Sequence, residues 1–276
     1  MILADYHVHS EFSSDSQAPM EQVIERALEL GLSRLCFTDH MDYDYPPVSR
    51  HDFMFDPEAY VKKLASLREQ YHKKIEILTG IELGLQPHLL ERLNSLINKY
   101  PFDFIIGSSH VVDHYDPYFP EYWEDKTKEQ GITRYFESII ENCKVFHAFH
   151  VYGHIDYIIR YVPKKYIDPS GKSMPDYSYL DFSDLLDEVL KTILSYGRGI
   201  EVNSAGLKYG LPYPHPKAEI LKRYRELGGE LITIGSDAHK PEHLCYDFSL
   251  LPEYLKSLGF RYYAVFKQGQ PTYEKL

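Results

Sequence analysis

Short apolar runs alternate with longer amphipathic segments along most of the chain. The short runs have the length of buried strands, and the longer segments repeat apolar residues about every three or four positions, which is typical of helices. Strands are expected at residues 2–9, 35–40, 75–82, 102–110, 151–155, 199–203 and 231–237. Helices are expected at residues 20–30, 57–72, 87–98, 128–146, 182–196, 217–227 and 252–258, and an eighth apolar run occupies residues 262–266.

This alternation predicts an α/β protein with one parallel sheet. Consecutive strand–helix units place neighbouring strands parallel, with right-handed crossovers between them. The chain has 276 residues, a length that a single α/β barrel commonly occupies, and no linker-like segment divides it. We therefore expect residues 1–276 to form one domain, a closed barrel. No apolar run is long enough to span a membrane, so no membrane partner is expected.

Three long connections interrupt the regular spacing of the predicted elements. They occupy residues 41–55, 111–127 and 160–180, and each is rich in Tyr, Asp and Pro. Each follows a strand, and the loops that follow strands form the active-site face of a barrel. These connections are therefore expected to form the walls or the lid of a pocket.

Histidines and carboxylates gather where the predicted strands end, in the motifs "HVH", "TDH", "GIELG", "SSH", "GHID" and "SDAH". These residues, with one early aspartate, are His7, His9, Asp15, His40, Glu82, His110, His154, Asp237 and His239. The ends of barrel strands converge on one mouth, and imidazole with carboxylate suits Zn²⁺, Mn²⁺ or Fe²⁺. The set is too large for one tetrahedral ion and predicts two or three ions. The other histidines are interpreted as surface or structural residues, with His51 and His243 the strongest exceptions.

Composition narrows the choice of partner and compartment. The net charge of −11 and the lack of a basic stripe argue against a nucleic-acid partner. Three widely spaced cysteines predict neither a disulfide framework nor a CxxC site, which favours a reducing cytoplasm. The first residues have no basic segment followed by a cleavable apolar segment, so export is not expected. Sequence alone does not predict the oligomeric state.

The motifs also resemble those of a known family. "DYHVHSEFSSDS", "FTDH", "GIELG", "GSSHVV", "YGHIDYIIRY", "EVNSAGLKYG" and "GSDAH" follow in the order of the polymerase and histidinol phosphatase (PHP) family, from about residue 5 to residue 239. The resemblance is greatest to the stand-alone histidinol-phosphate phosphatases. It implies a distorted (β/α)7 TIM-like barrel whose metal site, with three divalent ions, lies at the C-terminal face of the strands.

The resemblance also implies a division of the ligands among three ions. His7, His9, Glu82 and Asp237 would hold the first ion. Glu82 would bridge to a second ion, which is also held by His110 and His154. Asp15, His40 and His239 would hold the third ion. Some relatives have histidine at the position of Asp15, so the type of that ligand varies within the family.

The implied reaction is the hydrolysis of L-histidinol phosphate to L-histidinol and phosphate, a step of histidine biosynthesis. A metal-activated water would attack phosphorus, with Glu82 and Asp237 as catalytic residues, and Asp237 or a histidine could stabilise the leaving alkoxide. Arg160 and Lys208 follow strands and could bind the phosphate, although relatives often have arginine near Lys208. Arg198 precedes a strand and should lie at the opposite end of the barrel.

The loops that follow the strands could recognise the rest of the substrate. Their acidic residues and tyrosine neighbours could hold the amine and stack against the imidazole. The acids are Asp42, Asp44, Asp113, Asp116 and Glu121. Three alternatives remain at this point: a 3′–5′ exonuclease or nucleotide phosphoesterase, a broad-specificity sugar phosphatase, and a non-catalytic PHP module. The last would be expected to lack some ligands, and none is missing here.

Overall fold

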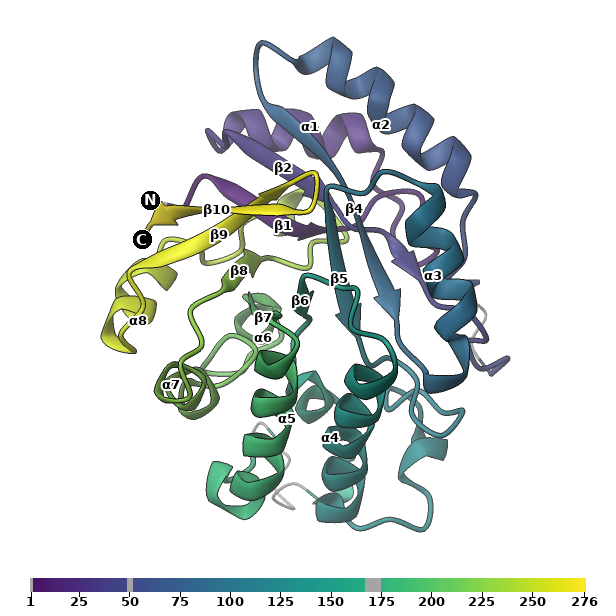
Figure 1. The fold of residues 1–276 in the computed structure, drawn as a ribbon, viewed down its shortest axis with the longest axis vertical. Coiled ribbons are helices and arrows are strands. Elements are labelled where there is room, and N and C mark those ends of the chain that lie inside the picture. The colour runs from purple at the N-terminus through teal and green to yellow at the C-terminus, as the bar shows by residue number, and fades with distance from the viewer. Residues whose placement is uncertain (1, 49–51, 167–174) are drawn as a thin grey trace.

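Eight parallel strands form the centre of the molecule in a computed structural model that describes residues 2–48, 52–166 and 175–276 (Figure 1). They are β1 (Ala4–Val8), β2 (Arg34–Phe37), β3 (His40–Met41), β4 (Glu76–Gly84), β5 (Phe104–Ser108), β6 (Val151–Tyr152), β7 (Gly199–Asn203) and β8 (Ile232–Gly235). The order is β1-β2-β4-β5-β6-β7-β8, and the short β3 pairs with β4. Just past β8, Ala238 forms a parallel bridge with Val8, so the last strand returns to the first. The prediction of an α/β barrel is confirmed.

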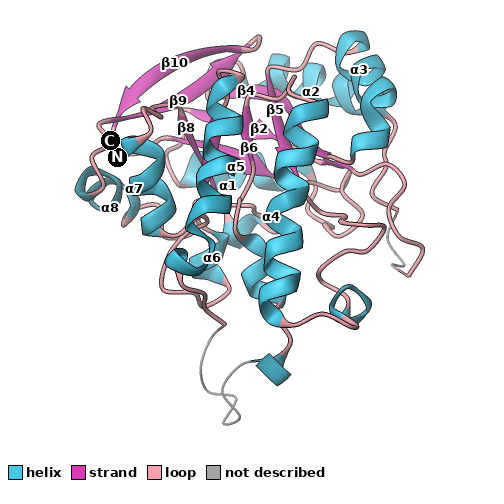
Figure 2. Ribbon diagram, turned by 60° about the horizontal axis from the view of Figure 1, so that its bottom comes forward, coloured by secondary structure: helices cyan, strands magenta, loops and turns pink. Residues whose placement is uncertain are grey.

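Helices surround the strands on the outside (Figure 2). They are α1 (Met20–Glu29), α2 (Pro57–Tyr71), α3 (Leu90–Lys99), α4 (Lys128–Val145), α5 (Ser183–Ser195), α6 (Ala205–Lys208), α7 (Ala218–Glu226) and α8 (Leu251–Ser257). Local sequence sets where they begin: the Asp56 side chain accepts a hydrogen bond from the backbone N–H of Glu58 at the start of α2, and Thr127 with Gln130 forms a capping box on α4. Within the described ranges, no helix is both apolar enough and long enough to cross a bilayer.

Short 3₁₀ helices fill the connections between the larger elements. They are η1 (Pro87–Leu89), η2 (Pro120–Trp123), η3 (Tyr157–Tyr161), η4 (Lys164–Tyr166), η5 (Tyr179–Phe182) and η6 (Pro241–His243). η2 belongs to the long connection after β5, and η3 follows β6. The connections after β5 and β6 therefore contain short helices of their own within the described residues.

The structure divides one predicted strand into two. The segment expected at residues 35–40 breaks between β2 and β3, where Asp39 has a buried carboxylate. That carboxylate accepts hydrogen bonds from the backbone N–H of Ser10 at 2.6 Å and from the Ser13 hydroxyl at 2.8 Å. The break therefore fixes the loop after β1, which the strand pattern alone does not indicate.

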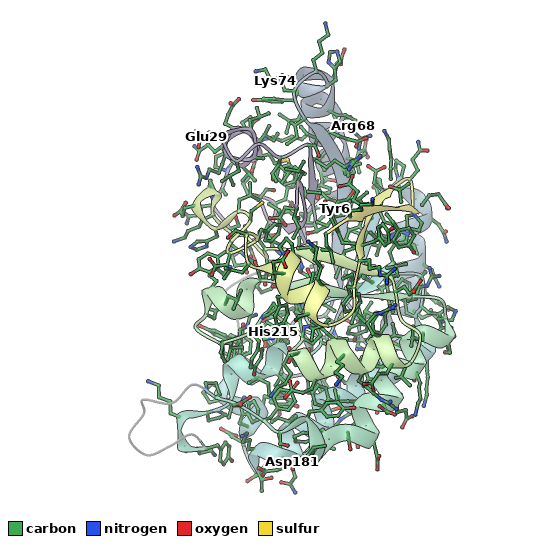
Figure 3. The ribbon with its side chains drawn as sticks, turned by 90° about the vertical axis from the view of Figure 1, so that its left-hand side faces the viewer. Tyr6, Glu29, Arg68, Lys74, Asp181 and His215 are labelled. Atoms are coloured by element: carbon green, nitrogen blue, oxygen red, sulfur yellow. The ribbon has the colours of Figure 1, made fainter. Side chains whose placement is uncertain are left out.

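The eighth apolar run forms a hairpin that covers the N-terminal end of the barrel. It consists of β9 (Tyr262–Lys267) paired antiparallel with β10 (Gln270–Lys275). The Tyr6 hydroxyl lies beside the hairpin (Figure 3), donates to the Phe266 carbonyl and accepts from the Phe266 N–H, both at 2.9 Å. Asp103, just before β5, accepts the N–H of Gln268. The hairpin closes the end of the barrel opposite the strand-end histidines and leaves the other end open.

Candidate metal centre

The side chains predicted to bind metal converge at the C-terminal ends of the strands. Six of them line a pocket of about 490 Å³: Asp15, His40, His110, His154, Asp237 and His239. The other three, His7, His9 and Glu82, lie beneath it with exposed fractions of 1% or less. His51 lies outside the described residues. His243, the second histidine singled out from the sequence, also lines the pocket.

Glu82 lies between two groups of histidines. Its Oε2 atom is 3.1 Å from His7 Nε2 and 3.6 Å from His9 Nε2. Its Oε1 atom is 3.2 Å from His110 Nε2 and 3.0 Å from His154 Nε2. His40 Nδ1 also lies 3.1 Å from Oε2. The two carboxylate oxygens therefore face different sets of imidazoles, an arrangement that suits a carboxylate shared by two ions.

A third group lies on the side of the pocket nearest the early aspartate. Asp15 Oδ2 is 3.0 Å from His239 Nε2 and 3.8 Å from His40 Nε2. The His9 ring packs against both of these histidines, with centroid distances of 4.1 Å to His239 and 4.3 Å to His40. Asp237 adopts a left-handed backbone conformation with φ of 53°, and its Oδ1 atom lies 3.4 Å from His9 Nε2.

The donor set fits divalent metal ions. His7 Nε2, His9 Nε2 and Glu82 Oε2 are buried without a hydrogen-bond partner, although their ligand atoms lie within 4.8 Å of one another. Buried polar atoms without partners are costly, so their convergence indicates that a further group satisfies them. Imidazole nitrogen and carboxylate oxygen are the ligands that zinc and related ions prefer.

Mutual electrostatics hold the carboxylates in the ionised form that coordinates a metal. Burial acts to raise the pKa of Glu82, but the surrounding imidazoles, His7 foremost, lower it well below the usual value. Burial acts to lower the pKa of His7, whereas its carboxylate neighbours, led by Glu201, raise it well above the usual value. Burial lowers the pKa of His9, and the nearby His239 acts in the same direction.

Two buried carboxylates beside the ligands were not predicted to contact them. Glu201 Oε1 on β7 is 2.6 Å from His7 Nδ1, and Glu201 is only 1% exposed. Asp42 Oδ1 is 2.7 Å from His110 Nδ1, and Asp42 is 2% exposed. The one sequence signal for Glu201 is a charged residue within the apolar strand "GIEVN". Asp42 was assigned to substrate recognition at the rim; it lines the pocket, but its Oδ1 atom is bonded to His110, and its role toward the substrate stays a prediction.

Arg160, on η3, reaches the pocket as predicted. Its side chain is 9% exposed, and its Nη1 atom is 4.0 Å from Asp237 Oδ2. The guanidinium stands over the rings of Tyr157, Tyr161 and Tyr209 at 4.5–5.3 Å, while its Nε and Nη1 atoms have no hydrogen-bond partner. A buried guanidinium with free donors that faces a pocket can bind an anion there.

Lys208, on α6, also lines the pocket. Its ammonium donates to the Asp237 backbone carbonyl at 2.9 Å, and burial lowers its pKa. Lys208 is therefore already engaged, in contrast to the free donors of Arg160. Arg198 immediately precedes β7, at the N-terminal side of the strand, where the sequence placed it.

The acidic rim differs from the sequence prediction. Asp116 lines the pocket, is 7% exposed and accepts a hydrogen bond from the Tyr45 hydroxyl. The prediction is wrong for Asp44 and Asp113, which lie outside the pocket lining. Asp44 pairs with Arg92 at 2.7 Å, and Asp113 pairs with Arg134 at 2.7 Å. Glu121 is also absent from the lining. The sequence contains no sign of which acidic loop residues would form ion pairs with arginines outside the pocket.

The fold and the site define a class of protein: a parallel barrel whose strand ends carry a histidine- and carboxylate-rich site for divalent metals. The sequence profile of the PHP domain matches residues 5–205. The chain therefore belongs to the PHP domain family, as its motifs indicated.

Relatives within the family share most of the chain. The histidinol-phosphatase of Lactococcus lactis is 29% identical over 268 residues, which cover 95% of this chain and 93% of the relative. A probable histidinol-phosphatase of Clostridium acetobutylicum is 31% identical over 244 residues, which cover 88% and 89%. The similarity thus extends over nearly the full length of both proteins.

A solved structure shows the same fold. The crystal structure of the Lactococcus lactis histidinol phosphate phosphatase, complexed with zinc, L-histidinol and phosphate, aligns with a TM-score of 0.86 and 27% identity. The alignment covers 98% of each chain. The putative histidinol phosphatase of Listeria monocytogenes aligns with a TM-score of 0.72 at 18% identity, over 90% of this chain and 99% of that one, and shows the fold alone.

Proposed function

We propose that this protein is a metal-dependent phosphomonoesterase that hydrolyses L-histidinol phosphate to L-histidinol and phosphate. The observation that carries the proposal is the pocket itself. A cluster of metal-ligand side chains lies in it, and Arg160, whose buried guanidinium has two nitrogens without a protein partner, lines the same pocket. The structural relative with zinc, L-histidinol and phosphate supports the choice of substrate.

The ion sites follow the three groups of side chains around Glu82. His7, His9, Asp237 and Glu82 Oε2 would hold one ion, and His110, His154 and Glu82 Oε1 would hold a second. Asp15, His40 and His239 would hold a third. We propose zinc, iron or manganese at these sites. Bound ions of this kind supply Lewis-acid charge that activates water and balances the charge of phosphoryl oxygens.

The chain's own residues would bind and orient the ester. Arg160 would donate to phosphate oxygens through Nε and Nη1, the atoms that have no protein partner. Lys208 adds a positive charge at the same wall while it holds the Asp237 backbone. Glu82 and Asp237 are the proposed catalytic residues, because they would hold the ions beside the reacting phosphorus. The Asp237 carboxylate also forms an ion pair with Arg160 at 4.0 Å.

The far side of the pocket suits a cationic, aromatic group. Asp116 lies there among aromatic side chains that also line the pocket, including Phe53, Tyr118 and Tyr161. A carboxylate among aromatic rings can hold an amine and pack against an imidazole. A plain sugar phosphate or a nucleotide has no cationic amine to pair with Asp116, so the rim favours histidinol phosphate over both alternatives. A cytoplasmic location and the absence of nucleic-acid and membrane partners stay predictions.

A substrate panel tests the proposal. The metal-loaded protein is assayed with L-histidinol phosphate, a nucleoside monophosphate and a sugar phosphate under identical conditions. Histidinol phosphate should exceed the other two in kcat/KM by at least about a hundredfold, because only its amine and ring match the rim. Comparable turnover of a nucleotide or a sugar phosphate would replace this assignment with the broad-specificity alternative.

A further inference from the structure

We infer that Glu201 and Asp42 are positioning residues that each tie together histidines of two different ion sites. The inference rests on the proposed metal centre. Neither residue belongs to the proposed ligand set, and both are buried directly behind it. Each contacts its histidines through ring nitrogens or a backbone N–H, and for His7 and His110 the contacted nitrogen is the one that does not face Glu82.

Glu201 connects the first and second ion sites from below. Its Oε1 atom is 2.6 Å from His7 Nδ1, so the opposite ring atom, Nε2, faces Glu82. Its Oε2 atom accepts the backbone N–H of His154 at 3.0 Å and the Asn203 amide at 3.2 Å. Because an ionised carboxylate only accepts, it fixes the His7 proton on Nδ1 and keeps Nε2 free as a ligand.

Asp42 has the corresponding place between the second and third sites. Its Oδ1 atom is 2.7 Å from His110 Nδ1, and its Oδ2 atom is 3.3 Å from His40 Nδ1. The Nε2 atoms of these histidines face Glu82 and Asp15 respectively. Asp42 thus holds the His110 ring through its Nδ1 atom and lies beside the His40 Nδ1 atom, which is also 3.1 Å from Glu82 Oε2. Glu201 holds the His7 ring and the His154 backbone in the corresponding way.

Glycines leave the space that both carboxylates occupy. A Cβ atom at Gly235 would lie 2.5 Å from Glu201 Oε1 and 2.3 Å from His7 Cβ. A Cβ atom at Gly84 would lie 1.7 Å from Asp42 Oδ1. Any larger residue at either position would displace a carboxylate from its histidine. The contacts therefore depend on residues of four strands, β1, β4, β7 and β8, that come together only in the folded barrel.

The experiment replaces Glu201 with glutamine. A glutamine offers one acceptor oxygen and one NH₂ group where Glu201 receives three donors. Either the NH₂ faces the donors from His154 and Asn203, or it donates to His7 Nδ1 and forces the His7 proton onto Nε2. Both arrangements weaken the metal sites, and outer-shell changes of this type cost roughly 10- to 100-fold in metal affinity.

The readout is zinc affinity, measured on chelator-stripped protein by competition with a chromophoric chelator. Glu201→Gln and Asp42→Asn should each bind zinc roughly 10- to 100-fold more weakly than wild type. The matched control is Asp103→Asn, because Asp103 is also a buried carboxylate but bonds Arg68 at the other end of the barrel. It should lower Tm and leave zinc affinity unchanged. At saturating metal, hydrolysis by Glu201→Gln should recover with KM near wild type.

Two results would overturn the inference. One is wild-type zinc affinity in a folded Glu201→Gln protein; the other is an equal loss of affinity in the Asp103→Asn control. If the glutamine variant does not fold, Glu201→Asp replaces it, since the shorter carboxylate keeps the charge but withdraws from His7 and should still weaken binding. A wild-type protein that binds no zinc would instead remove the proposed metal centre.

Discussion

At the residue scale, the proposed metal ligands could be predicted from the sequence, whereas the carboxylates that contact them could not. The strand-end histidines could be predicted because a motif such as "HVH" places both imidazoles on one face of a strand. Glu201 could not be predicted as a partner of His7, because 194 positions separate them and only barrel closure brings them within 2.6 Å. Likewise, nothing local showed that Asp42 turns inward to His110 while Asp44 turns outward to Arg92.

Arg160 carries a prediction at this scale. Arg160→Ala should lower kcat/KM for the phosphate ester by roughly ten- to a hundredfold, the equivalent of losing about 1.5–3 kcal/mol of charged hydrogen bonding. Metal content should not change, because Arg160 is not a ligand. Steady-state kinetics and metal analysis of the same preparation measure both. The matched control is Arg198→Ala. Arg198 lies at the N-terminal end of β7, away from the pocket, so this variant should keep wild-type kinetics. Unchanged kinetics in Arg160→Ala would remove Arg160 from phosphate binding.

At the element scale, the strand and helix periodicities predict the barrel, whereas the positions of the hairpin and of the loops depend on contacts between residues far apart in the sequence. The predicted segments reproduce seven strands of the sheet within a few residues of their ends. The β9–β10 hairpin could not be placed, because its position depends on Tyr6 and Asp103, far away in the sequence. The connection that carries Arg160 depends on another distant contact: Asp156 Oδ1 lies 2.5 Å from Nδ1 of the buried His215 ring.

His150, between α4 and β6, carries a prediction at this scale. Its Nδ1 atom accepts the backbone N–H of Ile105 at 2.9 Å, and its ring packs against Phe104 and Phe266. Burial, with the nearby Arg198 charge, lowers its pKa to about 4. The folded pKa lies below the unfolded value of about 6.5, so stability is complete above that pH. It falls as the pH drops from about 6.5 toward 4, because the unfolded state takes up the proton first.

Chemical denaturation at pH 7 and pH 5 measures this effect. The free energy of unfolding of wild type should fall by about 2 kcal/mol more than that of His150→Asn, whose side-chain oxygen replaces Nδ1 as an acceptor but does not titrate. Because the metal ligands are the same in both proteins, their own pH dependence cancels in the comparison. Equal pH dependence in the two proteins would show that His150 is not held neutral by the fold.

At the scale of the whole molecule, an acidic protein concentrates its ligands for positive ions at one end. A net charge of −11 is unfavourable for a surface that binds nucleic acid. Metal ions bound in the pocket would supply the local positive charge that attracts a phosphate ester. The family and the barrel were predictable because the motifs recur in order along most of the chain. The treatment of residues 1–276 as one domain stays a prediction, as do the number and identity of the ions.

The most direct test of the account is a metal titration that follows hydrolysis of L-histidinol phosphate. Protein stripped by a chelator is titrated with zinc or manganese, and bound metal per chain is counted at each step. We predict no turnover in the stripped protein and a maximum at about three ions per chain, since Glu82 joins two ion sites and Asp15 lies at a third. Full turnover in the stripped protein, or a maximum at a single ion, would contradict the account.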